Sequence, residues 1–166
     1  MTSILKCAVI TPIGPGHEET YERLCVPSVK HAIAQNSGPF SLIELMPIYD
    51  LKGKEGRSNS RNIGVAKALA ENFDWIFFLD ADDLLFGEAF KGVEPFINDY
   101  SGIWGNIVEA QFPDLDPRKL RENQTTPSTD STTLLEVDPL LTLQMEHFVK
   151  TEIAAAYPFD SQMNAG

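Results

Sequence analysis

The sequence has only two cysteines, Cys7 and Cys25, among 166 residues. They lie far apart with no Cys-x-x-Cys or Cys/His spacing, so the pattern indicates neither a zinc site nor a redox dithiol. We expect two buried free thiols. A single domain of this length can bury roughly two-thirds of its unfolded surface, so the fold needs no disulfide scaffold.

Basic residues and long apolar runs are also scarce. Lys and Arg total 13 against 24 Asp and Glu, a formal net charge of −11 that argues against nucleic-acid or anionic-lipid partners. No stretch reaches the about 18 apolar residues that span a bilayer, and the N-terminus lacks a secretory signal pattern. The sequence therefore predicts a soluble, cytoplasmic protein with no integral membrane segment.

What the chain does contain is an alternation of strand and helix patterns. Apolar runs bounded by Pro, Gly or Asp predict strands, and apolar residues at helical spacing predict helices. Such an alternation predicts an α/β sandwich with a largely parallel sheet, whose ligands collect at the carboxyl ends of the strands. The predicted strands are 5–13, 42–49, 75–79 and 103–108; the predicted helices are 17–35, 58–73, 87–100, one from Asp138 and one from Thr151, with a polar loop over 111–133.

Three carboxylates, Asp80, Asp82 and Asp83, directly follow the apolar run WIFFL. Such crowded like charges repel one another, whereas hard oxygen ligands suit Mg²⁺ or Mn²⁺ shared with substrate phosphates. The alternative is an acidic turn that caps the next helix and faces water. Neither a P-loop nor an EF-hand fits, since the required Lys, Ser/Thr, Gly and Glu positions are not matched. Asp50 and the Pro12–Gly16 turn end two other predicted strands, so three strand ends converge on one candidate site.

The block GRSNSRNIGVAKALAENFDWIFFLDADD resembles the centre of glycosyltransferase family 2, where an R-N-x-G helix leads into a strand ending in D-x-D-D. The resemblance extends to AVITPI, CVPSVKHAIAQ and FVKTEIAAAYPFDSQMNAG. It implies a GT-A fold: a Rossmann-like three-layer α/β sandwich with a mostly parallel central sheet. It also implies one domain over 1–166, with a nucleotide-sugar-binding half at 1–110 and an acceptor-side part at 111–166 that is apparently truncated.

The same resemblance assigns roles to the acidic residues. Asp82 would ligate the Mn²⁺ or Mg²⁺ that bridges the two phosphates of the donor. Asp80 would contact the ribose or join the metal ligands, and Asp83 would support both side chains from behind.

Four further residues would contact the nucleotide. Asp50 matches the position at which relatives hydrogen-bond the base, although the loop after it is shorter than in relatives. Pro12 and Ile13 would offer backbone contacts, and Arg61 would lie near the nucleotide. The expected donor is a UDP-sugar.

The reaction implied by the resemblance is metal-dependent, inverting transfer of a sugar to an unknown acceptor hydroxyl, which requires a base. Glu109, at the end of a predicted strand, is the candidate. In the family, the segment like YPFDSQMNAG runs into an acidic pair that carries the expected base, whereas this sequence ends at Gly166. One alternative is therefore a noncatalytic nucleotide-sugar-binding remnant. Another is a sugar nucleotidyltransferase, although the turn TPIGPGHEE lacks the basic residue such enzymes use.

Overall fold

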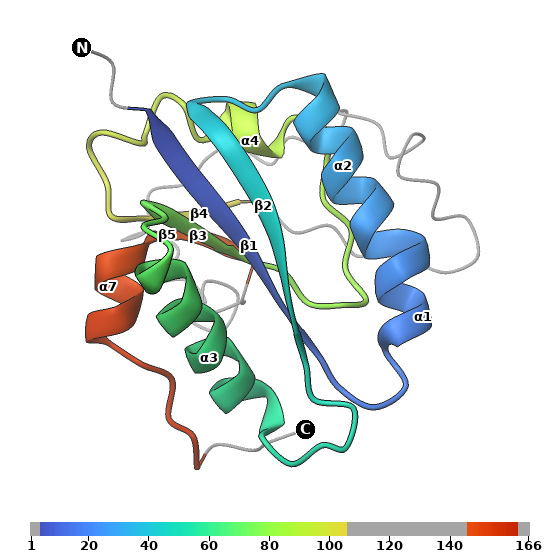
Figure 1. The fold of residues 1–166 in the computed structure, drawn as a ribbon. Coiled ribbons are helices and arrows are strands. Elements are labelled where there is room, and N and C mark those ends of the chain that lie inside the picture. The colour runs from blue at the N-terminus through green and yellow to red at the C-terminus, as the bar shows by residue number, and fades with distance from the viewer. Residues whose placement is uncertain (1–3, 106–145, 163–166) are drawn as a thin grey trace, which may run out of the picture.

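The computed structural model describes residues 4–105 and 146–162 and contains one five-stranded sheet (Figure 1). The strand order is β2-β1-β3-β5-β4, and β1 pairs in parallel with both β2 and β3. β5 runs antiparallel to β3 and β4, so four of the five strands share one direction. The strands are β1 Leu5–Ile13, β2 Phe40–Tyr49, β3 Trp75–Phe78, β4 Gly102–Trp104 and β5 His147–Lys150.

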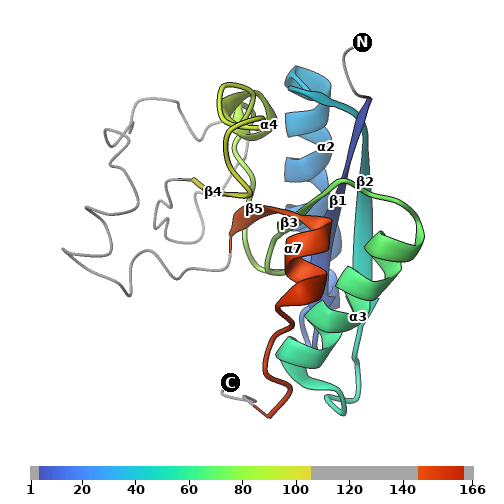
Figure 2. The ribbon, with the colours of Figure 1, turned by 90° about the vertical axis from the view of Figure 1, so that its left-hand side faces the viewer.

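Helices cover both faces of this sheet and complete three layers, as the two views in Figure 1 and Figure 2 show. One face carries α1, a π-helical segment continuous with it, α2 and α4. The other face carries α3 and α7. The bounds are α1 Glu18–Thr20, the π-helical segment Tyr21–Cys25, α2 Val26–Gln35, α3 Gly56–Ala70, α4 Ala89–Gly92 and α7 Thr151–Ala156.

β1 shows why the sheet needs two covering layers. Cys7 and Val9 pack in the core beneath α2, whereas Ala8 and Ile10 pack in the core beneath α3, and all four are fully buried. Alternate side chains of a strand point to opposite faces, so a continuous apolar run suits a strand that is covered on both sides. Cys25 is buried as well, and both thiols are free, which confirms the expectation for the two cysteines.

α3 docks closely on β1 because Gly64 has no side chain. A Cβ at Gly64 would lie 2.5 Å from Cγ2 of Ile10, closer than two carbon atoms can approach. This close contact brings the first turns of α3 to the carboxyl ends of β1 and β3. None of the helices in the described part of the chain is long and apolar enough to cross a membrane.

Most predicted elements are confirmed, with three differences. β2 begins before Leu42 and is an edge strand, as Pro47 suggested. The helix expected over 87–100 is wrong beyond a short α4, since Gly92 and Pro95 interrupt it and turns follow. β5 was not predicted. The predicted strand at 103–108 corresponds to β4 where it is described, and 111–133 and the Asp138 helix lie outside the described residues.

Candidate functional site

A cleft of about 330 Å³ opens at the carboxyl edge of the sheet. The turn after β1, the loop after β2 and the acidic turn after β3 surround it, together with the first turns of α3. This arrangement confirms that the three strand ends meet. The lining residues are Pro12, Gly14, Pro15, His17, Asp50, Gly53, Lys54, Gly56, Arg57, Ser60, Asp80, Ala81 and Asp82.

Asp50 shapes one wall of this cleft. Its carboxylate accepts backbone N–H bonds from Lys54, Glu55 and Gly56 at 2.8–2.9 Å, so it holds the β2–α3 loop and caps the start of α3. Although desolvation acts to raise the pKa of Asp50, the three donors hold it below its ordinary value, and the group is an anion at neutral pH. Its predicted contact with a nucleotide base stays a prediction.

Pro12 and Ile13, which were expected to offer backbone contacts to a nucleotide, lie in different surroundings. Pro12 lines the cleft, whereas the side chain of Ile13 is fully buried in the core. The carbonyl of Ile13 accepts the backbone N–H of Asp50 at 2.8 Å. Ile13 therefore ties the ends of β1 and β2 together.

Arg61 is the buried cation of the site. Its guanidinium lies 2.6 Å from Asp80 Oδ1, and its side chain is only 6% exposed. The ring of Phe159 covers it, with 5.7 Å between Cζ and the ring centroid. Arg57, one turn earlier, lies 4.0 Å from Asp80 Oδ2 but is 55% exposed. Arg61 thus fixes the orientation of Asp80, while Arg57 extends into the cleft.

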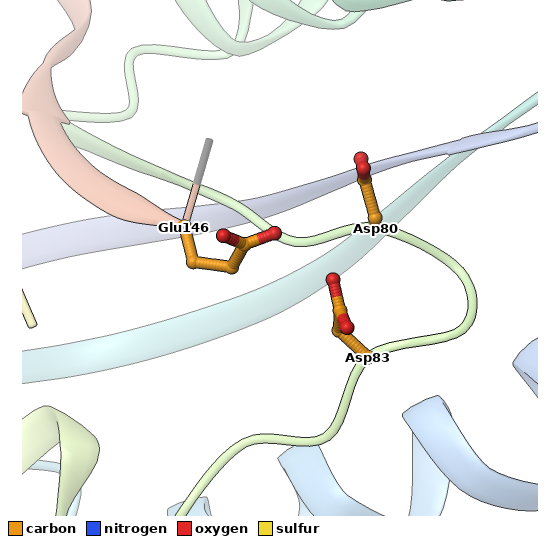
Figure 3. A group of neighbouring side chains, drawn as sticks. All are labelled: Asp80, Asp83 and Glu146. Carbon is orange, nitrogen blue, oxygen red and sulfur yellow. The ribbon is translucent and has the colours of Figure 1, made fainter. Parts of the chain in front are cut away.

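Asp80, Asp83 and Glu146 form a group in which one carboxylate oxygen from each residue lies within 4.8 Å of the other two (Figure 3). Glu146 reaches the group because β5 pairs with β3 and places the residue before His147 beside the end of β3. Asp82 is exposed and faces the cleft instead. The sequence pattern missed Glu146, since only the unpredicted pairing of β5 brings it here.

Burial and acidic neighbours perturb the carboxyl of Asp83. Burial, the hydrogen bond to Glu146 and repulsion from Glu146, Asp82 and Asp80 raise its pKa from 3.8 to about 7. These neighbours favour the neutral carboxyl of Asp83, which in its protonated form donates a hydrogen bond to Glu146. Asp83 therefore releases its proton less readily than an exposed aspartate does.

The raised pKa predicts that the metal-free chain loses stability as the pH rises from about 4 to about 7, because the folded state then binds more protons than the unfolded state. Since Asp83 is only partly buried, we expect a loss of about 1 to 2 kcal/mol. Urea unfolding in the presence of a chelator, at pH 5 and pH 8, measures it. Asp83→Asn should remove this difference; an identical pH dependence in the variant would contradict the prediction.

Asn62 joins the segment after α7 to α3. Its side-chain amide donates to the carbonyl of Phe159 at 2.8 Å, and its Oδ1 accepts the Phe159 N–H at 2.9 Å. Phe159 also packs edge-on against Phe78, with ring centroids 5.3 Å apart. The sequence pattern of R-N-x-G marked this helix but did not indicate the partner of Asn62. These two hydrogen bonds hold in place the Phe159 ring that covers Arg61.

Replacing Asn62 with alanine should lower the free energy of unfolding by about 1 to 3 kcal/mol, because two partly buried backbone groups of Phe159 lose their partner. Urea denaturation measures the loss. Asn59→Ala is the matched control, since Asn59 lies on the same helix and bonds to the exposed side chain of Glu55. Equal effects of the two substitutions would show that the two hydrogen bonds between Asn62 and Phe159 add no stability.

Two comparisons with known proteins find similarity to this chain. The family model described as "Glycosyl transferase family 2" matches residues 46–153, which is more than half of the chain. A crystal structure of residues 1–349 of TarS from S. aureus is similar, with a TM-score of 0.58 and 16% identity over 98% of this chain. This chain spans about half, 52%, of that structure. A search of curated proteins gives no match. Glu109, the predicted base, lies outside the described residues.

Proposed function

Because this chain belongs to glycosyltransferase family 2 and has the GT-A type of fold, we propose that its cleft binds a nucleoside diphosphate sugar with a divalent cation. The reaction is transfer of the sugar, with inversion, to an acceptor hydroxyl. One observation carries the proposal: the ends of β1, β2 and β3 surround a single cleft of about 330 Å³, within the size range of small-molecule sites. A UDP-sugar is the proposed donor.

The charges that line the cleft support a diphosphate ligand. Lys54 and Arg57 lie on the α3 side, and Asp80 and Asp82 lie on the β3 side. The two cations offset phosphate charge, while Asp50, held by three backbone donors, presents a fixed acceptor to the base. Arg61 keeps Asp80 in one orientation from beneath.

The carboxylates fit a hard divalent cation. Asp80 and Asp82 line the cleft and would hold Mn²⁺ or Mg²⁺ together with the phosphates, with Asp83 and Glu146 beside Asp80. When bound, the cation stabilises negative charge on the leaving diphosphate. Inversion also needs a carboxylate within hydrogen-bond reach of the acceptor hydroxyl, and Glu109 is the proposed base.

Calorimetry of UDP binding with and without Mn²⁺ tests the proposal. We expect each ligand to tighten binding of the other, because the phosphates supply ligands that the carboxylates leave open. UDP-, GDP- and dTDP-sugars are then compared. Failure of every nucleotide to bind in the presence of Mn²⁺ would overturn the proposed function.

Two substitutions distinguish the possible metal ligands. Asp82→Asn should abolish the coupling between Mn²⁺ and UDP if the cation lies in the cleft. Glu146→Gln should preserve most of it, since Glu146 is not among the residues that line the cleft. The reverse result would indicate that the cation binds in the group formed by Asp80, Asp83 and Glu146 instead.

A further inference from the structure

Phe159 lies between the two elements that carry the buried ion pair of the site. Pro158, which cannot continue a helix, follows the end of α7, and the chain then runs beside α3 (Figure 1). The ring of Phe159 packs edge-on against Phe78 of β3, with centroids 5.3 Å apart. Two hydrogen bonds join its backbone to the side chain of Asn62 on α3. Phe159 is thus fixed to β3 and to α3 at once.

The same ring covers the guanidinium of Arg61, with 5.7 Å between Cζ and the ring centroid. The Arg61 side chain is only 6% exposed, and its Nη2 donates to Asp80 Oδ1 at 2.6 Å. Within the residues that the structure describes, Nε of Arg61 has no hydrogen-bond partner. Because Nε adds no hydrogen bond, the position of the guanidinium depends on the ion pair and on the ring that covers it.

The ion pair occupies one oxygen of Asp80 and leaves the other available. Oδ1 accepts from Arg61, whereas Oδ2 lies 4.0 Å from Arg57, an exposed residue that lines the cleft. A carboxylate that is held by one oxygen presents the second oxygen in a fixed direction, as a ligand for a cation requires. Water that reached the ion pair would weaken it, because the effective dielectric constant would rise. The ring of Phe159 limits that access.

We propose that Phe159 is a positioning residue for the cation of this site: its ring keeps Arg61 against Asp80, and Asp80 in turn presents Oδ2 to the cation. Phe159 is not among the residues that line the cleft, so it acts through Arg61. The inference rests on the proposed function and deepens it, because it makes affinity for the cation depend on a residue far along the chain from Asp80. Partners that orient a metal ligand contribute about 10- to 100-fold to metal affinity. Since Phe159 acts through such a partner, we expect a contribution of about 5- to 10-fold.

Calorimetry of UDP with and without Mn²⁺ compares three substitutions of Phe159. Phe159→Ala should reduce the tightening of UDP binding by Mn²⁺ about 5- to 10-fold. Phe159→Leu keeps apolar volume but offers no aromatic face to the guanidinium, and should reduce it about threefold. Phe159→Tyr retains the ring and should restore the coupling. Tyr157→Ala, which removes a ring that is 77% exposed in the same segment, is the matched control and should bind normally.

Circular dichroism establishes which variants are folded. If Phe159→Ala does not fold, Phe159→Leu decides the question, because it changes the volume of the side chain least. Coupling of normal strength in the folded variants overturns the proposal. Stronger coupling overturns it as well, since it would show that the paired Arg61 opposes the cation.

A reciprocal effect separates positioning from a merely structural role. If docking of Phe159 tightens cation binding, the bound cation must stabilise that docking by the same factor. The N–H of Phe159 donates to Asn62 Oδ1 at 2.9 Å, and its exchange with solvent should slow about 5- to 10-fold with UDP and Mg²⁺ bound. Mg²⁺ is used because Mn²⁺ is paramagnetic. The N–H of Tyr157, bonded to Ile153 in α7, is the internal control. Equal slowing of both amides, or none, contradicts the proposal.

The failure of this proposal is distinguishable from failure of the proposed function. Nitrogen-15 NMR observes the Arg61 guanidinium without any ligand, and restricted rotation of its NH₂ groups reports the pair with Asp80. We expect restricted rotation in the unsubstituted chain and faster rotation in Phe159→Leu. Failure of the unsubstituted chain to bind any nucleotide with Mn²⁺ would overturn the proposed function, whatever the rotation. Normal UDP binding with Mn²⁺, together with unchanged rotation in Phe159→Leu, would overturn only the positioning role of Phe159.

Discussion

Replacing Asp80 with asparagine should abolish the tightening of UDP binding by Mn²⁺. Asp80 belongs to the cleft lining, to the group with Asp83 and Glu146, and to the ion pair with Arg61. Loss of residues that only support metal ligands costs about 10- to 100-fold in metal affinity, so loss of a direct ligand should cost about 100-fold or more. Calorimetry of UDP at fixed Mn²⁺ measures the change.

Two controls make this result specific to the site. Asp99→Asn removes an exposed carboxylate far along the chain from the cleft residues and should leave binding unchanged. Circular dichroism and urea unfolding of Asp80→Asn establish that the protein remains folded, since Arg61 loses its charged partner. Metal-enhanced UDP binding of normal strength in folded Asp80→Asn would exclude Asp80 from the cation site.

Replacing Arg61 with methionine should lower the free energy of unfolding by about 2 to 4 kcal/mol. Breaking a buried ion pair leaves an uncompensated charge, which typically costs about 3 to 5 kcal/mol. We expect somewhat less because the Asp80 side chain is 22% exposed. Methionine retains much of the apolar contact with Phe159, so the loss reports mainly on the charge. Urea denaturation monitored by circular dichroism measures it.

Arg57→Met is the matched control for Arg61. Both arginines face Asp80 from α3, but Arg57 is 55% exposed and 4.0 Å away, so its replacement should change stability by no more than about 0.5 kcal/mol. A double-mutant cycle of Arg61→Met with Asp80→Asn should show a coupling of about 1 to 3 kcal/mol. Equal stability losses at the two arginines, or additivity in the cycle, would refute the buried pair.

Much of the cleft was predictable because it depends on short stretches of sequence. A continuous run of apolar residues predicted β1 as a strand covered on both faces. Asp50, Pro12 and Asp80 were placed at strand ends by their position after such runs. Parallel strands end at the same edge, so these residues had to converge. The helix expected over 87–100 failed because its apolar spacing outweighed the breaks at Gly92 and Pro95 in the prediction.

Local patterns in the sequence specify most of the strands and helices and the residues that end them, since runs, spacing and turn residues act over a few positions. Which distant side chains meet at the strand ends depends on how the elements pack in three dimensions. Four-residue β5 is too short to show a period, yet its antiparallel pairing delivers Glu146 to Asp83 and His147 to Trp104. Asn62 likewise finds the backbone of Phe159 only after α7 packs beside α3. Such contacts depend on how the layers pack, and no local pattern encodes that packing.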